Sequence, residues 1–283
     1  MRYAVALALT VLVAGGCGRE PAAPGTSEAH AESRALLDGG DFDGVLADLA
    51  GESDADALYL MGRAWVGKAG GDARTLSGRL GPEEMQAQDL FQQALAARPD
   101  HAQAHLALAE LLAPYALLSQ EGKDETDAGP VVTVDRVLRA YGGAVQADPA
   151  DTVAVNGLID FALKAGRTRE AAAGFRELTR RDRENPEVLI RFGDFLAGPG
   201  ENPQEALGVY AQALIWRPDD QATHAKIADL HIDAALSHLE LDQYVAVEAE
   251  LREARKHVRG KDSSQARRLR DAERALTHAS GRR

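Results

Sequence analysis

The chain has 283 residues, which is enough for one or two domains with a buried core. Its formal net charge of −12 argues against wrapping a polyanion, so we expect no nucleic-acid partner. The charge is uneven along the chain. Residues 249–283 carry 11 Lys or Arg against 5 Asp or Glu, a net charge of +6, which leaves −18 for residues 1–248. The single cysteine, Cys17, excludes an intramolecular disulfide and a cysteine-based metal cluster.

The first 16 residues have the layout of a signal peptide. Arg2 precedes an almost wholly apolar run over residues 3–13, and small residues follow it. The run is shorter than the ~20 apolar residues of a membrane span. Ala14-Gly15-Gly16-Cys17 resembles a bacterial lipobox, although Ala14 replaces the usual Leu. The resemblance implies that Cys17 is lipidated and becomes the new N-terminus; the alternative is an ordinary signal peptide with a chance cysteine.

Residues 17–29 are small, polar and rich in Pro and Gly, which indicates a lipidated cysteine followed by a flexible tether. Two or more acyl chains give stable membrane anchoring, whereas one is marginal. The resemblance to bacterial sorting signals, with Gly18 rather than Asp after the cysteine, implies the outer membrane, facing the periplasm, if the cell has one. We therefore expect a lipid-anchored protein of the cell envelope.

A repeated spacing organises the rest of the chain. Ala87-x3-Phe91-x2-Ala94-x4-Pro99 recurs from Val137 to Pro149 and from Ala206 to Pro218. This pattern resembles the second helix of a tetratricopeptide repeat, whose period is 34 residues. Matching first-helix patterns are Leu58-x2-Met61-Gly62-x2-Trp65, Leu189-x2-Phe192-Gly193-x2-Leu196, and variants beginning at His105 and His224.

The resemblance implies an all-α fold, a solenoid of stacked antiparallel helix hairpins over residues 30–262 with about five to six repeats. Residues 264–279 have a narrow apolar stripe and several arginines, so residues 263–283 are expected to form a C-terminal capping helix and basic tail. The basic end is either the solvated face of this cap or a contact for an anionic surface. Gly193 is expected at a close helix contact, and both Trp65 and Trp216 are expected in the core rather than in a ligand site.

Motifs of catalysis are missing from the sequence, since it contains no nucleophile elbow, P-loop or dinucleotide fingerprint. We expect no enzyme activity, no cofactor and no small-molecule substrate. His224, His231 and His238 are the best metal candidates, but spacing of seven places them about 10.5 Å apart along a helix. Packing already explains His224 and His231, so no metal site is predicted; an enzyme remains an alternative only if these histidines bind metal.

In this family the concave face, formed by the first helix of each repeat, binds partners. The resemblance assigns to that face Tyr59, Arg63, Leu106, Glu110, Asn156, Asp160, Ile190, Asp194, Asp229 and Asp233. Such a partly apolar, acidic groove should prefer basic or amphipathic peptide segments. A merely solvated face is the alternative.

Two insertions interrupt the regular period, at residues 68–80 and 120–130. Both are expected between the first and second helices of adjacent hairpins, at one edge of the solenoid. They are either a binding surface or tolerated loops. The sequence as a whole predicts a membrane-anchored scaffold for an envelope assembly or secretion machinery, with a tethered regulator that recruits a cell-wall hydrolase or protease as the alternative.

Overall fold

The computed structural model describes residues 30–70, 80–120, 132–261 and 263–281. All regular secondary structure in these residues is helical. The helices are α1 (Ala31–Asp38), α2 (Phe42–Asp48), α3 (Ala55–Ala69), α4 (Pro82–Ala97), α5 (Ala102–Gln120), α6 (Val134–Ala147), α7 (Thr152–Lys164), α8 (Thr168–Arg181), α9 (Pro186–Ala197), α10 (Pro203–Trp216), α11 (Gln221–Glu240), α12 (Tyr244–His257) and α13 (Ser264–Ser280). The all-α prediction is confirmed.

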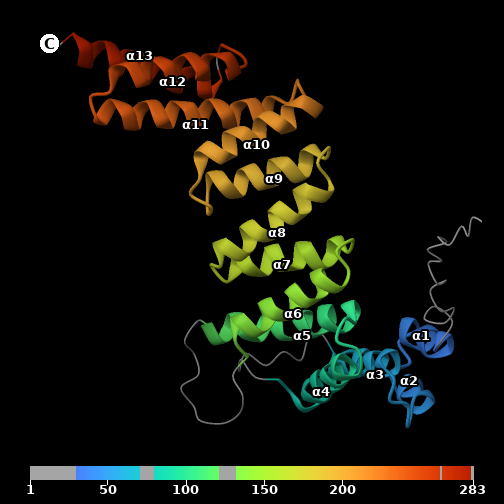
Figure 1. Ribbon diagram of the computed structural model, residues 1–283. Helices are drawn as coiled ribbons and strands as arrows, with labels where there is room; N and C mark the ends of the chain where they lie inside the picture. Colours follow the sequence, from blue (N-terminus) through green and yellow to red (C-terminus); the bar gives the residue numbers. More distant parts are fainter. Residues whose placement is uncertain (1–29, 71–79, 121–131, 262, 282–283) are drawn as a thin grey trace, which may run out of the picture.

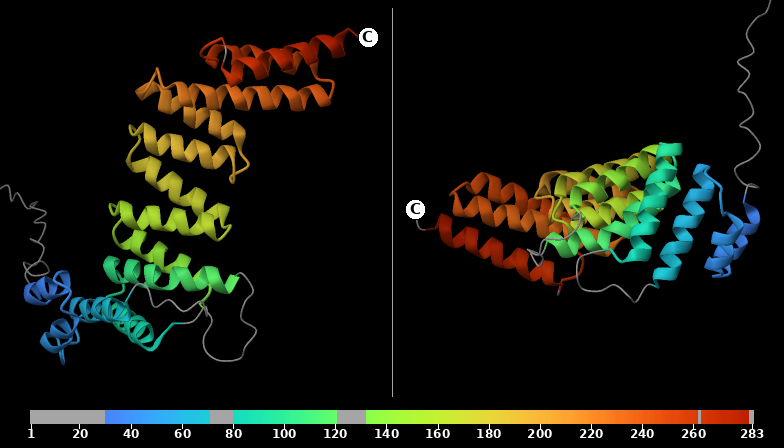
Figure 2. Two further views of the ribbon diagram at one scale, coloured as in Figure 1. Left: turned by 180° about the vertical axis from the view of Figure 1, so that it is seen from behind. Right: turned by 90° about the horizontal axis from the view of Figure 1, so that it is seen from below.

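Consecutive helices pair into hairpins that stack on one another (Figure 1). The pairs are α1/α2, α3/α4, α5/α6, α7/α8, α9/α10 and α11/α12, and α13 packs against both helices of the last pair. The turned views in Figure 2 show the same order, with α1 and α2 at one end of the stack and α13 at the other. The chain is therefore an α-solenoid in which each hairpin buries its apolar face against its neighbours.

Equivalent side-chain caps fix where four of the first helices, α3, α7, α9 and α11, begin. Asp54, Asp151, Asn185 and Asp220 each precede a first helix, and the side chain of each accepts hydrogen bonds from backbone N–H groups of the first turn. A second contact recurs in the first turn of α5 and of α11. Nε2 of His105 is 2.9 Å from the carbonyl oxygen of Pro99, and Nε2 of His224 is 2.9 Å from that of Pro218. These contacts attach the helix to the turn that precedes it.

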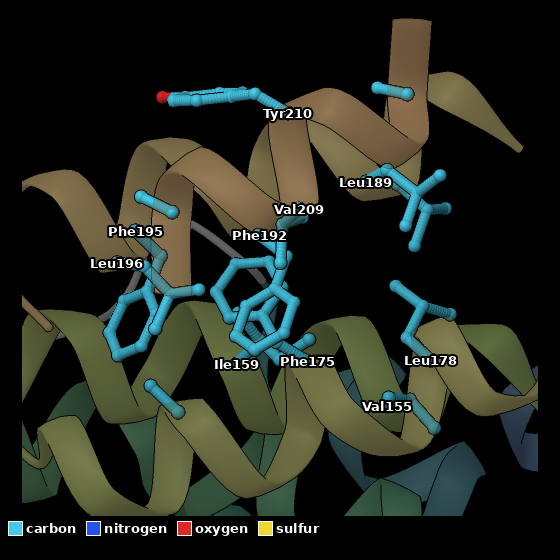
Figure 3. Close-up of a cluster of buried hydrophobic side chains, with 14 of the residues drawn as sticks. Val155, Ile159, Phe175, Leu178, Leu189, Phe192, Phe195, Leu196, Val209 and Tyr210 are labelled. Carbon is cyan, nitrogen blue, oxygen red and sulfur yellow. The ribbon is translucent and has the colours of Figure 1, made fainter. Parts of the chain in front are cut away.

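The central core lies between α7 and α11, and Figure 3 shows its aromatic centre. The ring centroid of Phe175 is 5.5 Å from that of Phe192 and 5.1 Å from that of Phe195, in stacked arrangements worth about 0.5–1.5 kcal/mol each beyond area burial. Glycines on first helices admit aromatic rings from the second helices. A Cβ atom added to Gly193 would lie 2.4 Å from Cε1 of Tyr210, and one added to Gly62 would lie 2.5 Å from Cε1 of Phe91. The expected close contact at Gly193 is confirmed.

The two tryptophans have different outcomes. Trp65 is partly buried and packs against two hydrophobic clusters, as expected. The prediction for Trp216 is wrong, because this side chain is 48% exposed. Trp216 is the last residue of α10, and the buried stripe of that helix ends at Ala213. The helical period places Trp216 near the stripe, but the chain leaves the helix there and the ring remains uncovered.

The two insertions lie between first and second helices, since α3 ends at Ala69 before Pro82 and α5 ends at Gln120 before Val134. Part of the second excess extends the helix itself, because α5 has 19 residues and α7 has 13. Residues 71–79 and 121–131, and residues 1–29 with Cys17, lie outside the described residues. Among the helices that are described, none is long and apolar enough to cross a membrane.

Candidate binding face

The first helices α3, α5, α7, α9 and α11 share a set of surface positions, which we call the first-helix face. Its members are the fifth and ninth residues of each helix. The fifth residues are Tyr59, Leu106, Asn156, Ile190 and Ala225, and the ninth residues are Arg63, Glu110, Asp160, Asp194 and Asp229. Asp233 lies one turn after Asp229. Helices α3, α5 and α7 contact one another in turn, and ion pairs join α7 to α9 and α9 to α11. The fold thus brings the predicted residues onto one continuous face.

Two of the acids on this face, Asp160 and Asp194, are paired with bases from the next first helix. Arg191 on α9 lies 3.6 Å from Asp160 and donates a hydrogen bond of 2.9 Å to Asn156 on α7. Lys226 on α11 lies 2.5 Å from Asp194 on α9. These two bases are the sixth residues of their helices.

The capping helix repeats the arrangement at the end of the solenoid. Arg268 on α13 pairs with Asp229 and lies 2.5 Å from Asp233, while Gln265 donates a hydrogen bond of 2.9 Å to Asp229. Such exposed pairs contribute about 0–1 kcal/mol each to stability. Their larger effect is electrostatic, because they offset the acidity from which the sequence predicted a preference for basic segments. A base at the sixth position of successive first helices was the signal that this prediction missed.

Arg191 and Lys226 each also lie over an aromatic ring of the preceding second helix. The guanidinium carbon of Arg191 is 5.8 Å from the ring centroid of Phe175, and Nζ of Lys226 is 5.8 Å from that of Tyr210. The hydroxyl of Tyr210 donates a hydrogen bond of 2.6 Å to Asp194. A base, a ring and an acid therefore form a repeated unit at the α7/α9 and α9/α11 junctions.

The N-terminal end of the face opens into a groove of about 940 Å³. Residues from α1, α2, α3 and the start of α5 line it, with apolar Leu37, Phe42 and Tyr59 beside charged Arg34 and Arg63. Arg63 donates a hydrogen bond of 3.1 Å to the hydroxyl of Tyr59 on its own helix. The groove offers both apolar contact and charged groups, which is the composition of many peptide sites.

A buried histidine forms part of the wall of this groove. His101 is 4% exposed, its Nδ1 accepts a hydrogen bond of 3.3 Å from the backbone of Ala104, and its Nε2 lies 3.4 Å from Asp56. Arg98 donates a hydrogen bond of 2.8 Å to the same Asp56 carboxylate. Burial, followed by the charge of Arg98, lowers the pKa of His101 against the opposing charge of Asp56. Burial thus disfavours the charged form of His101, and Arg98 is the base that donates to Asp56 here.

A smaller pocket of about 210 Å³ lies between α3, α4 and α5, and both Arg63 and Glu110 line it. Burial raises the pKa of Glu110, the charge of Arg63 lowers it, and Asp151 raises it further. Glu110 thus lies in a partly dehydrated position that disfavours its charge.

The three histidines of α11 have separate partners. Nδ1 of His224 is 2.9 Å from Nδ1 of His257, and Nδ1 of His231 is 2.6 Å from Glu250. Nδ1 of His238 is 2.7 Å from the side chain of Gln243. Within the described part of the chain, no group of three His, Cys, Asp or Glu side chains is arranged to hold a metal ion. Packing and hydrogen bonding account for His224 and His231, as expected from the sequence.

The basic end is built on α12 and α13. Leu269, Ala266 and Ala272 are the buried stripe of α13. A cleft of about 350 Å³ between the two helices is lined by Arg255, Lys261 and Arg270 together with Glu273 and apolar residues. Arg255 pairs with Glu273, so part of this positive charge is already offset.

No family model and no curated protein matches the chain. Solved structures resemble it at low similarity. MamA from Desulfovibrio magneticus RS-1 is 17% identical with a TM-score of 0.42, covering 67% of this chain and 93% of its own. YrrB, described as a TPR protein with an unusual peptide-binding site, is 14% identical with a TM-score of 0.41, covering 81% and 97%. The human IFIT1 dimer with PPP-AAAA is 15% identical with a TM-score of 0.41, covering 88% and 53%. Scores at this level carry no functional comparison.

Proposed function

We propose that this protein is a non-catalytic scaffold that holds a segment of another protein on its first-helix face. The observation that carries the proposal is the groove of about 940 Å³ at the N-terminal end of that face, where apolar and charged side chains from four helices converge. A groove of this size accommodates several residues of a peptide, and mixed apolar and charged walls provide both contact area and orientation.

The stacking of the hairpins supports the same proposal. Five first helices present their fifth and ninth residues in register, so that the face continues from the groove to the capping helix. The preferred partner segment is amphipathic, because the groove offers Leu37, Phe42 and Tyr59 as apolar contacts. A strongly basic segment is favoured less than the sequence suggested, since Asp160, Asp194 and Asp229 already have basic partners.

The setting of this activity is part of the proposal. The signal-peptide layout and the lipobox-like Cys17 support a scaffold that is lipid-anchored to a bacterial envelope membrane, with the solenoid held away from the surface by residues 17–29. An adaptor in an envelope assembly or secretion machinery fits this arrangement. The partner would then be another envelope protein with an exposed segment.

Photo-crosslinking in the native cell tests the proposal. A photo-reactive amino acid is placed at Asn156 on the first-helix face or, in the matched control, at Ile215, which is 71% exposed on the second helix α10. We expect a discrete crosslinked product from position 156 that is lost when Tyr59 and Phe42 in the groove are replaced by alanine. Equal products from both positions, or products only from position 215, would contradict binding at the first-helix face.

A further inference from the structure

The surface of the basic end, which we define as the described residues from 251 to 281, carries an unbalanced positive charge. Eight Lys or Arg side chains are exposed in this range, and Asp271 is the one exposed acid among its described residues. Three of the eight bases pair with acids of α12 or α13. The other five form no ion pair with a described residue: Arg252, Arg259, Lys261, Arg267 and Arg270.

This basic surface is hollowed where its two helices meet. Arg255, Lys261 and Arg270 line the cleft of about 350 Å³ between α12 and α13, together with apolar Val258 and Leu269. The guanidinium of Arg270 donates a hydrogen bond of 3.0 Å to the carbonyl oxygen of Lys261, which restricts its position beside the cleft. A carboxylate that approaches this surface gains charge-assisted hydrogen bonds.

The first hairpin carries the opposite charge. In residues 30–54, which we call the acidic end, seven Asp or Glu side chains are exposed and no Lys or Arg is. Four of the seven already have a partner within the chain. Glu32, Asp38 and Glu52 have no ion-pair partner among the described residues.

The two charged surfaces lie at opposite ends of the solenoid (Figures 1 and 2), because α1 and α2 begin the stack and α13 ends it. One copy cannot bring them together, since the hairpins from α3 to α10 lie between them. On the first-helix face in between, Asp160 and Asp194 already have basic partners. The acidic end is thus a complementary surface that only another copy of the chain can present to the basic end.

We propose that the basic end docks onto the acidic end of a second copy of this chain, so that copies associate head to tail. This goes beyond the proposed scaffold function, because the contact does not use the first-helix face. Two basic ends or two acidic ends repel each other, which disfavours a symmetric pair. Each docked copy leaves one basic and one acidic end free, so further copies add in the same direction and form an open row.

Reversing charges at either end tests the inference by sedimentation velocity of the full chain in neutral detergent. Arg252→Glu with Arg267→Glu reverses two bases of the basic end. We expect the average mass of the unaltered chain to rise with protein concentration, and the double variant to associate at least about tenfold more weakly. Raising the salt from about 0.1 M to about 1 M shortens the Debye length from about 10 Å to about 3 Å and should dissociate the unaltered chain.

A matched control separates the position of the charges from the net charge. Arg139 and Arg169 are exposed on the second helices α6 and α8, away from both ends. Arg139→Glu with Arg169→Glu changes the net charge by the same amount as the basic-end variant. This control should associate as the unaltered chain does.

A mixing experiment identifies the two surfaces in contact. Glu32→Lys with Glu52→Lys reverses charges of the acidic end, and this variant should also fail to self-associate. Mixed with the basic-end variant, it should form a 1:1 complex and no larger species, because the mixture retains one intact basic end and one intact acidic end per pair. Formation of the complex also shows that both variants are folded.

Three results would overturn the inference. The unaltered chain could remain monomeric at every concentration, the basic-end variant could associate as strongly as the control, or the mixture could form no 1:1 complex. In each case the basic end is either only solvated or docks onto another anionic partner, such as a lipid surface. Crosslinking from Asn156 tests the scaffold proposal separately, because that position lies on the first-helix face.

Discussion

Gly193 offers the sharpest test of how the hairpins pack. Its hypothetical Cβ atom would lie 2.4 Å, 2.7 Å and 2.9 Å from three atoms of the Tyr210 ring, which is 2% exposed and hydrogen-bonded to Asp194. Gly193→Ala must therefore displace a large buried ring, and overpacking of this kind costs about 1–3 kcal/mol. Displacement of the hydroxyl adds about 1 kcal/mol if the hydrogen bond to Asp194 is lost. Gly193→Leu should be more severe.

Gly208 provides the matched control on the partner helix. It lies inside α10, and an added Cβ atom would meet nothing within 4 Å. Gly208→Ala should stabilise the chain by about 0.5–1 kcal/mol through helix propensity alone. Urea unfolding followed by circular dichroism measures both variants. Gly193→Ala should lower the urea concentration at the midpoint of unfolding, and Gly208→Ala should raise it. If the midpoint of Gly193→Ala equals or exceeds that of the unaltered chain, the close contact and the assigned register are wrong.

Three further predictions concern the anchor, an insertion and acid stability. Cys17→Ala should move the protein from the membrane to the soluble fraction and leave the precursor unprocessed at this site; normal maturation and membrane fractionation would argue against lipidation. Replacing residues 120–129 by a short Gly-Ser turn should barely change the melting temperature but weaken capture of the native partner, and undiminished capture would leave binding to the first-helix face. Burial, with the charges of His224, His231 and Arg259 opposing the smaller effect of Glu253, lowers the pKa of His257 to about 4. The unfolded chain protonates His257 near pH 6.5 and the folded chain does not, so His257 should reduce the free energy of unfolding as pH falls from about 6.5 to 4. His257→Gln should therefore flatten the fall in melting temperature over that window. An unchanged slope would show that His257 does not cause the fall.

The hairpin architecture was predictable because local sequence and packing act in the same direction. The spacing of Phe91, Tyr141 and Tyr210 from their prolines marks equivalent second helices, and each ring is buried as that equivalence requires. Gly62 and Gly193 face two of these rings directly. The repeat pattern determines the fold when the same positions meet three requirements: the helical spacing of apolar residues, the close approach of paired helices, and the turn that ends each hairpin.

The electrostatics of the first-helix face could not be predicted in the same way. Arg191 and Asp160 are 31 residues apart, and their pairing depends on the register between two stacked helices rather than on the pattern within either. A count of acids therefore overestimated the negative charge of the face. Trp216 shows a related limit, because helical period places it near the buried stripe while the end of α10 decides that nothing covers it.

Hydrogen exchange of the full chain, compared with and without the crosslinked partner, tests the central claim most directly. The account predicts that binding protects backbone amides around the groove and the first-helix face, in α3, α5 and α7 above all. The second helices α8 and α10 should exchange at the same rate in both states. Protection confined to the second helices, or to the basic end on α12 and α13, would contradict the first-helix face as the site of binding.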